Sequence, residues 1–171
     1  FSRSPAVTKS GTIYYPIWHA YATAVLEQNG FDVKLIDAPA DNISHDECYK
    51  LASSYMPDIT VVYTSTPSIY NDIEVAEKIK LHTYCYTVLS GPHASAEPDE
   101  CLKYKNIDAV ARHEYDFSLL ELCQNYPNIE KIRNISGLSL KIDGNIIHNS
   151  DRPFTENLDE IPFISSVYKK H

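Results

Sequence analysis

Short apolar runs rich in β-branched residues alternate along this chain with segments of helical periodicity. The clearest run, 59–63, is continuous rather than alternating, as expected for a strand buried on both faces of a parallel sheet. Similar runs occur at 31–37, 85–89 and 107–111, and the first two each follow a segment with apolar residues at helical spacing. This alternation predicts an α/β fold built on a doubly wound parallel sheet.

Capping and breaker residues indicate where the helices begin and end. Pro16 opens an amphipathic helix that Asn29-Gly30 is expected to end. Ser44 and Glu47 have the spacing of a capping box at the start of a second helix, which ends at Met56-Pro57. Further helices are expected over 69–79 and around 119–122.

The pattern changes after Pro127. Asp143-Gly144 lies between two alternating segments within 137–148, which is a strong hairpin signal. From Ser150 to Pro162 no period is apparent, so that segment is interpreted as a linker. We therefore expect a Rossmann-like domain over 1–130, a C-terminal β-hairpin appendage over 131–150, and a linker over 151–171.

The segment from Phe1 to Thr12 is loop-like and leads directly into the first helix. In the flavodoxin-like strand order of a doubly wound sheet the first strand is central. Without it, two interior strand edges would lack partners. We therefore expect an apolar strand immediately before Phe1.

Composition excludes several functional classes. A net charge of -8 disfavours nucleic acid, which requires a basic face, and no apolar run is long enough to span a membrane. The four cysteines form no CxxC pair, and the chain has no secretory signal, which favours the cytoplasm. His82 and Cys85 alone do not make a four-coordinate metal site.

Three loops follow predicted strands at the carboxyl edge, where open parallel sheets bind ligands. Each also has a structural explanation: Gly91-Pro92 can simply end a strand, and hydroxyl residues can cap the next helix. Glu114 suits a helix N-terminus as well as a ligand contact, and Arg112 suits a salt bridge. The candidate binding residues are Thr64, Ser65, Thr66, Pro67, Gly91, Pro92, His93, Arg112, His113 and Glu114.

Nearly the whole chain resembles the N-terminal cobalamin-binding domain of cobalamin-dependent radical SAM proteins. This group contains anaerobic magnesium-protoporphyrin monomethyl ester cyclases and radical methyltransferases. The family pattern Gly-Gly-Pro-His-Ala-Thr stands here as Ser90-Gly91-Pro92-His93-Ala94-Ser95, and Pro98-Asp99-Glu100 follows it. The hairpin and the tail from Arg152 to Phe163 add to the likeness.

One motif departs from the family. The pattern Arg-Gly-Glu-Gly-Glu is represented by Arg112-His113-Glu114-Tyr115-Asp116, in which both glycines are replaced. Glycine allows positive φ and close approach of a ligand to the backbone. The sequence therefore predicts that His113 and Tyr115 narrow the pocket or stack on the ligand.

The resemblance implies a bound cobalamin, with its nucleotide tail beside Thr64, Ser65, Thr66 and Gly91. The chain lacks an Asp-x-His-x-x-Gly loop. The resemblance therefore implies a base-off cofactor, with His93 as its neighbour and not as a cobalt ligand. No catalytic residue and no metal ligand is assigned.

The resemblance also implies a parent enzyme whose downstream radical SAM domain carries a [4Fe-4S] cluster and S-adenosylmethionine. The parent would transfer a methyl group or carry out an oxidative cyclisation on a small-molecule substrate, while this segment alone would catalyse nothing. The alternatives are a flavodoxin-like or receiver-like domain that binds another ligand or a protein, and an interaction module that has lost cobalamin.

Overall fold

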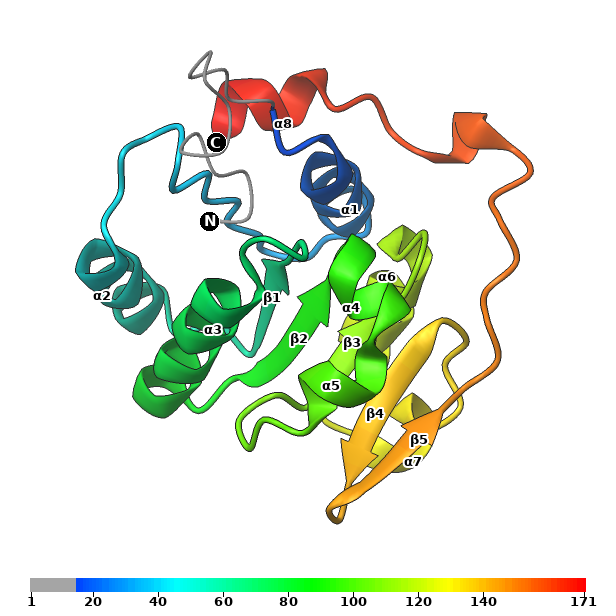
Figure 1. Ribbon diagram of the computed structural model, residues 1–171. Coiled ribbons are helices and arrows are strands. Elements are labelled where there is room, and N and C mark those ends of the chain that lie inside the picture. The colour runs from blue at the N-terminus through cyan, green and yellow to red at the C-terminus, as the bar shows by residue number, and fades with distance from the viewer. Residues whose placement is uncertain (1–14) are drawn as a thin grey trace.

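The computed structural model describes residues 15–171, and its five strands form one mixed sheet in the order β1-β2-β3-β4-β5 (Figure 1). The strands are β1 (Ile59–Tyr63), β2 (Tyr86–Ser90), β3 (Ala109–Ala111), β4 (Leu138–Ile142) and β5 (Asn145–His148). Strands β1, β2 and β3 are parallel, while β4 and β5 are antiparallel to their neighbours. The predicted hairpin is confirmed, and it continues the same sheet.

Helices cover both faces of the sheet, as the doubly wound prediction requires (Figure 1). Helices α3, α4 and α5 lie on one face, α1 and α6 lie on the other, and α2 packs against α3. The helices are α1 (Ile17–Gln28), α2 (His45–Tyr55), α3 (Ile69–Thr83), α4 (Pro92–Ala96), α5 (Pro98–Leu102), α6 (Asp116–Asn125), α7 (Ile129–Ile132) and α8 (Ser165–Lys170), with a short 3-10 helix at Leu158–Glu160.

The alternation of side chains along the central strands creates two apolar layers. Val88 packs with the α1 and α6 layer, whereas its neighbour Leu89 packs with α3, α4 and α5. In β3, Ala109 and Ala111 belong to the first layer and Val110 to the second. Because both faces are buried, these strands have continuous apolar sequences.

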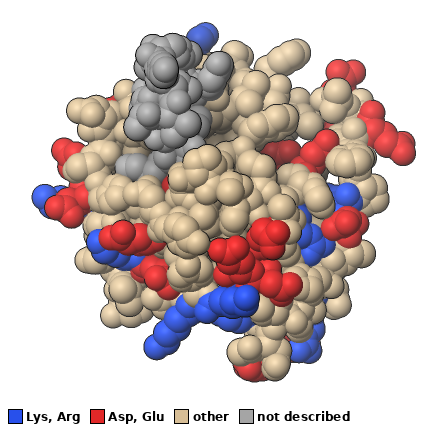
Figure 2. All heavy atoms as spheres, viewed as in Figure 1, with Lys and Arg blue, Asp and Glu red and all other residues tan. Residues whose placement is uncertain are grey.

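The predicted caps and turns form as expected. Ser44 and Glu47 make the complete capping box at the start of α2. Asp143 and Gly144 adopt φ values of 50° and 79°, as a tight primed hairpin turn requires. Figure 2 shows acidic side chains grouped around α5, whose first turn carries Asp99 and Glu100. Carboxylates there complement the helix dipole.

The prediction of a strand over 31–37 is wrong. The segment has no regular secondary structure, and within residues 15–171 it joins no ladder. A strand needs a hydrogen-bonded neighbour, and the described part of the chain places none beside it. The loop-like segment Phe1–Thr12 and the strand expected before Phe1 lie outside the described residues.

Helix α1 also differs from the amphipathic prediction, because it is buried on two sides. Ala22 faces the sheet, while Ala20 and Ala24 pack against Val167 of α8. The tail crosses the molecule from β5 and returns to cover α1 (Figure 1). Within residues 15–171, no helix has the length and apolar character needed to cross a membrane.

Candidate functional site

Three loops meet at the carboxyl edge of the parallel strands. Thr64–Ser68 follows β1, Gly91 joins β2 to α4, and Arg112–Tyr115 joins β3 to α6. The backbone N–H of Thr64 donates to the carbonyl of Ser90 (2.8 Å), and the N–H of His113 donates to Ser95 Oγ (2.9 Å). These bonds join the β1 loop to the end of β2 and the β3 loop to α4, so the three predicted loops are held side by side.

Gly91 permits the closest approach between two of these loops. Its φ is 101°, and a Cβ at this position would lie 2.4 Å from the carbonyl oxygen of Thr64. A side chain would therefore push the Thr64 loop away from the end of β2. Gly91 is therefore required because the two loops pack against each other. The sequence did not predict this packing.

A buried carboxylate fixes the loop after β1. Ser68 Oγ donates to Asp72 Oδ2 (2.6 Å), and it also lies 2.9 Å from Ser65 Oγ. Asp72 is completely buried in the first turn of α3, and burial raises the pKa of its carboxyl group. Asp72 therefore holds the loop from beneath, while Thr66 and Pro67 are exposed at the rim.

His93 faces the protein and not the solvent. Its side chain is 8% exposed, Nδ1 lies 3.2 Å from Thr66 Oγ1, and Nε2 lies 3.9 Å from Glu100 Oε2. Within residues 15–171, Nε2 has no hydrogen-bond partner. The imidazole links the β2 loop to the β1 loop, and Pro92 beside it is exposed.

Arg112 holds the end of β3 to the hairpin. One guanidinium nitrogen donates to Asn149 O (2.6 Å) and Asp151 Oδ1 (2.8 Å), and the other donates to Ser139 Oγ. The residue is 6% exposed. The Arg112 guanidinium group is therefore paired with the Asp151 carboxylate within the protein. This supports a salt bridge, rather than a ligand contact, as the role of Arg112.

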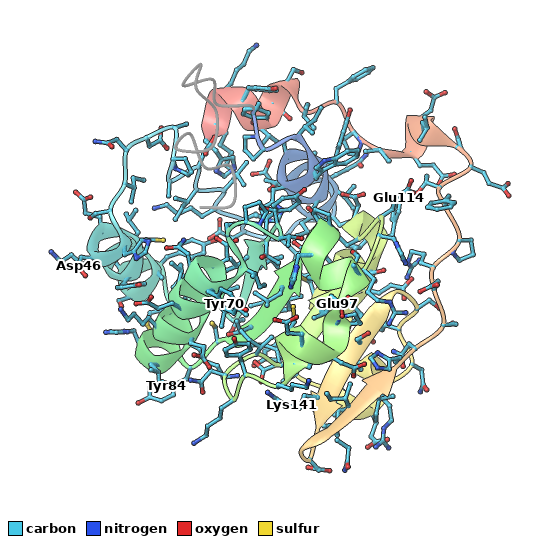
Figure 3. All side chains as sticks on the ribbon, viewed as in Figure 1. Asp46, Tyr70, Tyr84, Glu97, Glu114 and Lys141 are labelled. Atoms are coloured by element: carbon cyan, nitrogen blue, oxygen red, sulfur yellow. The ribbon has the colours of Figure 1, made fainter. Side chains whose placement is uncertain are left out.

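His113 and Glu114 form the turn between Arg112 and α6. His113 adopts φ 56°, so a bulky residue occupies the left-handed conformation that glycine favours. Glu114 Oε2 accepts a hydrogen bond from the backbone N–H of Thr155 (3.1 Å), and Figure 3 shows this side chain beside the tail. Both side chains are exposed, so they remain open to a ligand at the crevice.

Tyr115 does not form the crevice wall that the sequence predicted. Its ring is 4% exposed in the layer between the sheet and α6, and its φ is -106°, which needs no glycine. Its hydroxyl group lies 2.9 Å from His19 Nδ1 on α1. Tyr115 therefore fills the space beneath the loop and connects it to α1.

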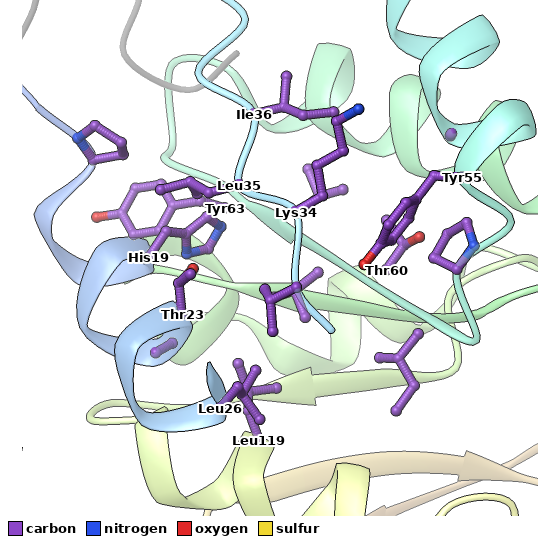
Figure 4. A pocket seen from close by; sticks show the side chains of 18 of the residues that line it. His19, Thr23, Leu26, Lys34, Leu35, Ile36, Tyr55, Thr60, Tyr63 and Leu119 are labelled. Atoms are coloured by element: carbon purple, nitrogen blue, oxygen red, sulfur yellow. The ribbon is translucent and has the colours of Figure 1, made fainter. Parts of the chain in front are cut away.

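Sequence reasoning did not identify His19 as part of the site. Burial lowers the pKa of His19 to about 4, and its ring contacts Tyr63 edge-on at a centroid distance of 5.4 Å. The sequence contains one indication of where His19 lies. The helical spacing of His19, Thr23 and Leu26 places all three on one face of α1. All three line the same cavity (Figure 4).

The site offers hydroxyl groups, backbone amides and a closely packed glycine rather than a metal centre. Among the described residues, no three His, Cys, Asp or Glu side chains come together as a metal ion would require. Burial raises the pKa of Asp116, at the start of α6, to about 6. Such a crevice suits an extended polar ligand held along three loops.

Comparison with known proteins gives a consistent assignment. The family model for the B12 binding domain matches residues 3–122. The chain is 30% identical over 157 residues to an uncharacterized methyltransferase, PH0819, of Pyrococcus horikoshii, a match that covers 91% of this chain and 34% of that protein. It is 28% identical over 155 residues to the anaerobic magnesium-protoporphyrin IX monomethyl ester cyclase of Rubrivivax gelatinosus, covering 85% of this chain and 28% of the cyclase.

A solved structure has the same fold. The cobalamin-dependent S-adenosylmethionine radical enzyme OxsB, with aqua-cobalamin and S-adenosylmethionine bound, matches with a TM-score of 0.73 and 16% identity. The match covers 86% of this chain and 21% of OxsB. The chain thus spans about a third or less of the length of these proteins.

Proposed function

We propose, from the premise that this chain belongs to the B12-binding domain family, that it is the cobalamin-binding module of a larger radical SAM enzyme. The observation that carries the proposal is that three loops are held side by side at the edge of the sheet where such folds bind ligands. The flavodoxin-like, receiver-like and cofactor-free alternatives are not favoured, because the family match spans residues 3–122.

The residues present fit the nucleotide tail of cobalamin. Thr66 places a hydroxyl group at the exposed rim, and Gly91, with φ 101°, allows the loops after β1 and β2 to lie close together beside it. The unpaired Nε2 of His93 is a further polar atom within the same loops, counted among the described residues. His113 and Glu114 are exposed on the loop after β3 and would be available to contact amide groups of the corrin.

Arg112 and Asp72 act through other residues rather than by touching the ligand. Arg112 fixes the β3 loop against the hairpin, and Asp72 fixes the β1 loop. When bound, cobalamin supplies a cobalt centre for methyl transfer or radical chemistry, which the protein positions. The orientation of the His93 ring toward Thr66 and Glu100 supports a role beside the cofactor and not as a cobalt ligand.

The whole enzyme would add a downstream radical SAM domain with a [4Fe-4S] cluster and S-adenosylmethionine. The substrate would be a small molecule held between the two domains, and the reaction would be methyl transfer or oxidative cyclisation. The support is the family membership together with the cyclase and methyltransferase relatives, which are about three times as long as this chain. We also propose a cytoplasmic location, because all four cysteines are free thiols.

Substituting glycine tests the proposal at the contact that organises the site. Gly91→Ala should displace the Thr64 loop and weaken hydroxocobalamin binding at least about tenfold, as measured by titration of the visible spectrum. Gly144→Ala is the matched control, since Gly144 also has positive φ (79°) but no atom within 4 Å of its Cβ position.

Circular dichroism would establish that both variants are folded under the titration conditions. Equal loss of affinity in the two variants would show that backbone strain from alanine at positive φ, and not the contact between the loops, controls binding. Unchanged affinity in Gly91→Ala would contradict the placement of the ligand at these loops.

A further inference from the structure

The segment that follows β5 runs along one of the loops of the candidate site before it turns away. We call this segment, residues 149–155, the brace. It lies beside the loop between β3 and α6, and Figure 3 shows Glu114 of that loop next to it. Three consecutive loop residues, Arg112, His113 and Glu114, each have a partner in the brace. The loop is therefore held from outside the parallel strands as well as by them.

Asp151 is the brace residue that contacts two members of the loop. Its Oδ1 accepts a hydrogen bond from the Arg112 guanidinium group (2.8 Å) and lies 3.7 Å from His113 Nε2. Arg112 is 6% exposed, whereas the Asp151 side chain is 67% exposed. Because a buried cation is stable only beside hydrogen-bonded acceptors, the guanidinium group fixes a carboxylate that otherwise reaches the solvent.

The brace ends at Thr155, whose backbone N–H donates to Glu114 Oε2 (3.1 Å). This contact fixes the path of the main chain, since the donor does not depend on the Thr155 side chain. Residues 156–160 are all exposed, and the Asn157 side chain accepts a hydrogen bond from its own 3-10 turn. The part of the tail that supports the loop therefore has a definite end.

The brace is also fixed to α6, independently of the loop. Arg152 Nε donates to Ser118 Oγ (2.9 Å), and its guanidinium group pairs with Glu121 Oε1 (2.6 Å). Gly137 has a φ of 81°, and a Cβ at this position would lie 2.6 Å from Ser118 Oγ and 3.3 Å from Arg152 Cβ. The brace thus packs so closely on the start of β4 and on α6 that a side chain at Gly137 would displace it.

The loop adopts a conformation that needs support from its neighbours. His113 has a φ of 56°, and a residue with a bulky side chain keeps such a conformation only where the surrounding structure holds it. Ser95 Oγ, in α4, accepts a hydrogen bond from the His113 N–H (2.9 Å), and Asp151 lies beside the His113 ring. Ser95 N in turn donates to Gly91 O (2.9 Å). Movement of the brace would therefore affect the loops after both β2 and β3.

We propose that Asp151 is a positioning residue for the cofactor, and that the brace and the bound cofactor stabilise each other. The cofactor is the cobalamin of the proposed function, on which this coupling rests. A ligand that binds the loop in its braced conformation gains affinity from every contact that populates this conformation. Because coupling between two sites is reciprocal, the bound ligand must also order the brace. Asp151 does not touch the ligand, and it acts through Arg112 and His113.

A purely structural role for Asp151 leads to different results. An ion pair that only stabilises the fold would lower the free energy of unfolding when it is removed, and it would leave the affinity of the folded protein unchanged. A positioning role changes the affinity of the folded protein. It also makes the order of the brace depend on whether the ligand is bound.

Amide hydrogen exchange resolved by NMR tests the coupling in the unmodified protein, with and without saturating hydroxocobalamin. We expect the cofactor to slow exchange of the Thr155 amide, which donates to Glu114, at least about fivefold. The Asp159 amide is the internal control, because it donates to Asn157 within the 3-10 turn beyond the brace. Its exchange should not change.

Variants test Asp151 itself by titration of the visible spectrum with hydroxocobalamin. Asp151→Asn removes the charge but keeps the shape, and it should weaken binding at least about fivefold in protein that circular dichroism shows to be folded. Asp151→Glu should restore most of the affinity, because the exposed side chain has room for one more methylene group. Asp159→Asn is the matched control, since it removes an exposed carboxylate of the same tail beyond the brace.

The two measurements separate this coupling from the proposed function. Absence of hydroxocobalamin binding in the unmodified protein would overturn both. Binding with unchanged Thr155 exchange, or with unchanged affinity in folded Asp151→Asn, would overturn the coupling alone. Equal losses of affinity in Asp151→Asn and Asp159→Asn would also overturn it, because they would show an effect of net charge. If Asp151→Asn does not fold, exchange in the unmodified protein decides: slowing at Thr155 but not at Asp159 supports the coupling.

Discussion

His113 is the residue at which the chain departs most clearly from its family pattern, and the structure gives that departure a physical cost. The position keeps φ at 56°, the conformation that a glycine adopts without strain. Replacing the residue at this position with glycine relieves about 1–2 kcal/mol of steric conflict in the folded state. The greater conformational entropy of the glycine variant in its unfolded state partly offsets this gain.

His113→Gly should therefore raise the free energy of unfolding by about 0.5–1 kcal/mol in urea denaturation. His113→Ala is the control, because alanine loses the imidazole but keeps the Cβ conflict. If the glycine variant is no more stable than the alanine variant, the turn is not strained in the way its φ indicates.

His19 should remain neutral to unusually low pH. Burial lowers its pKa to about 4 from the ordinary value of 6.5, so the unfolded chain binds a proton that the folded chain excludes. The His19 contribution to stability is therefore complete above pH 6.5 and is lost as the pH falls toward 4. An imidazole NMR titration should give a midpoint near 4; a midpoint near 6.5 would mean that the ring is solvated.

At the scale of elements, Asp72 connects α3 to the loop that follows β1. Asp72→Ala should remove the carboxylate to which Ser68 donates and loosen that loop, reducing cobalamin affinity about tenfold. Asp46→Ala is the matched control, since Asp46 is an exposed carboxylate in the first turn of α2. Titration of the visible spectrum would measure both, and equal affinities would remove Asp72 from the site.

Helix α8 should stabilise the molecule through α1. Val167 is fully buried against Ala20 and Ala24, and Tyr168 stacks on Tyr15 at a centroid distance of 3.5 Å. Val167→Ala should lower the free energy of unfolding by about 2 kcal/mol, while the exposed Lys169→Ala should change it little. A negligible effect of Val167→Ala in urea denaturation would indicate that α8 is detached in solution.

How well the sequence predicted each element depended on where the element's partners lie. Strand β1 was predicted at its observed bounds, because burial on both faces leaves a continuous apolar run. The hairpin was predicted because Asp143-Gly144 is a local signal. Segment 31–37 failed to form a strand because strand formation needs a neighbour, and the described residues supply none.

The same distinction explains the candidate site. The loop at Gly91 was recognisable because its neighbours in the sequence carry the pattern. The pairing of Tyr115 with His19 spans 96 residues, and no local pattern encodes it. Likewise, Arg112 appeared in the sequence as a possible cofactor contact, but its partners Asn149 and Asp151 become apparent only when the tail folds back.

For the whole molecule, the fold, the three loops held side by side and the family match lead to one claim: this chain holds cobalamin. The most direct measurement is to incubate the purified protein at micromolar concentration with hydroxocobalamin, separate it by gel filtration, and record its visible spectrum. We predict that corrin absorbance elutes with the protein at about one cofactor per chain. Elution of all corrin absorbance with the small molecules would contradict the account.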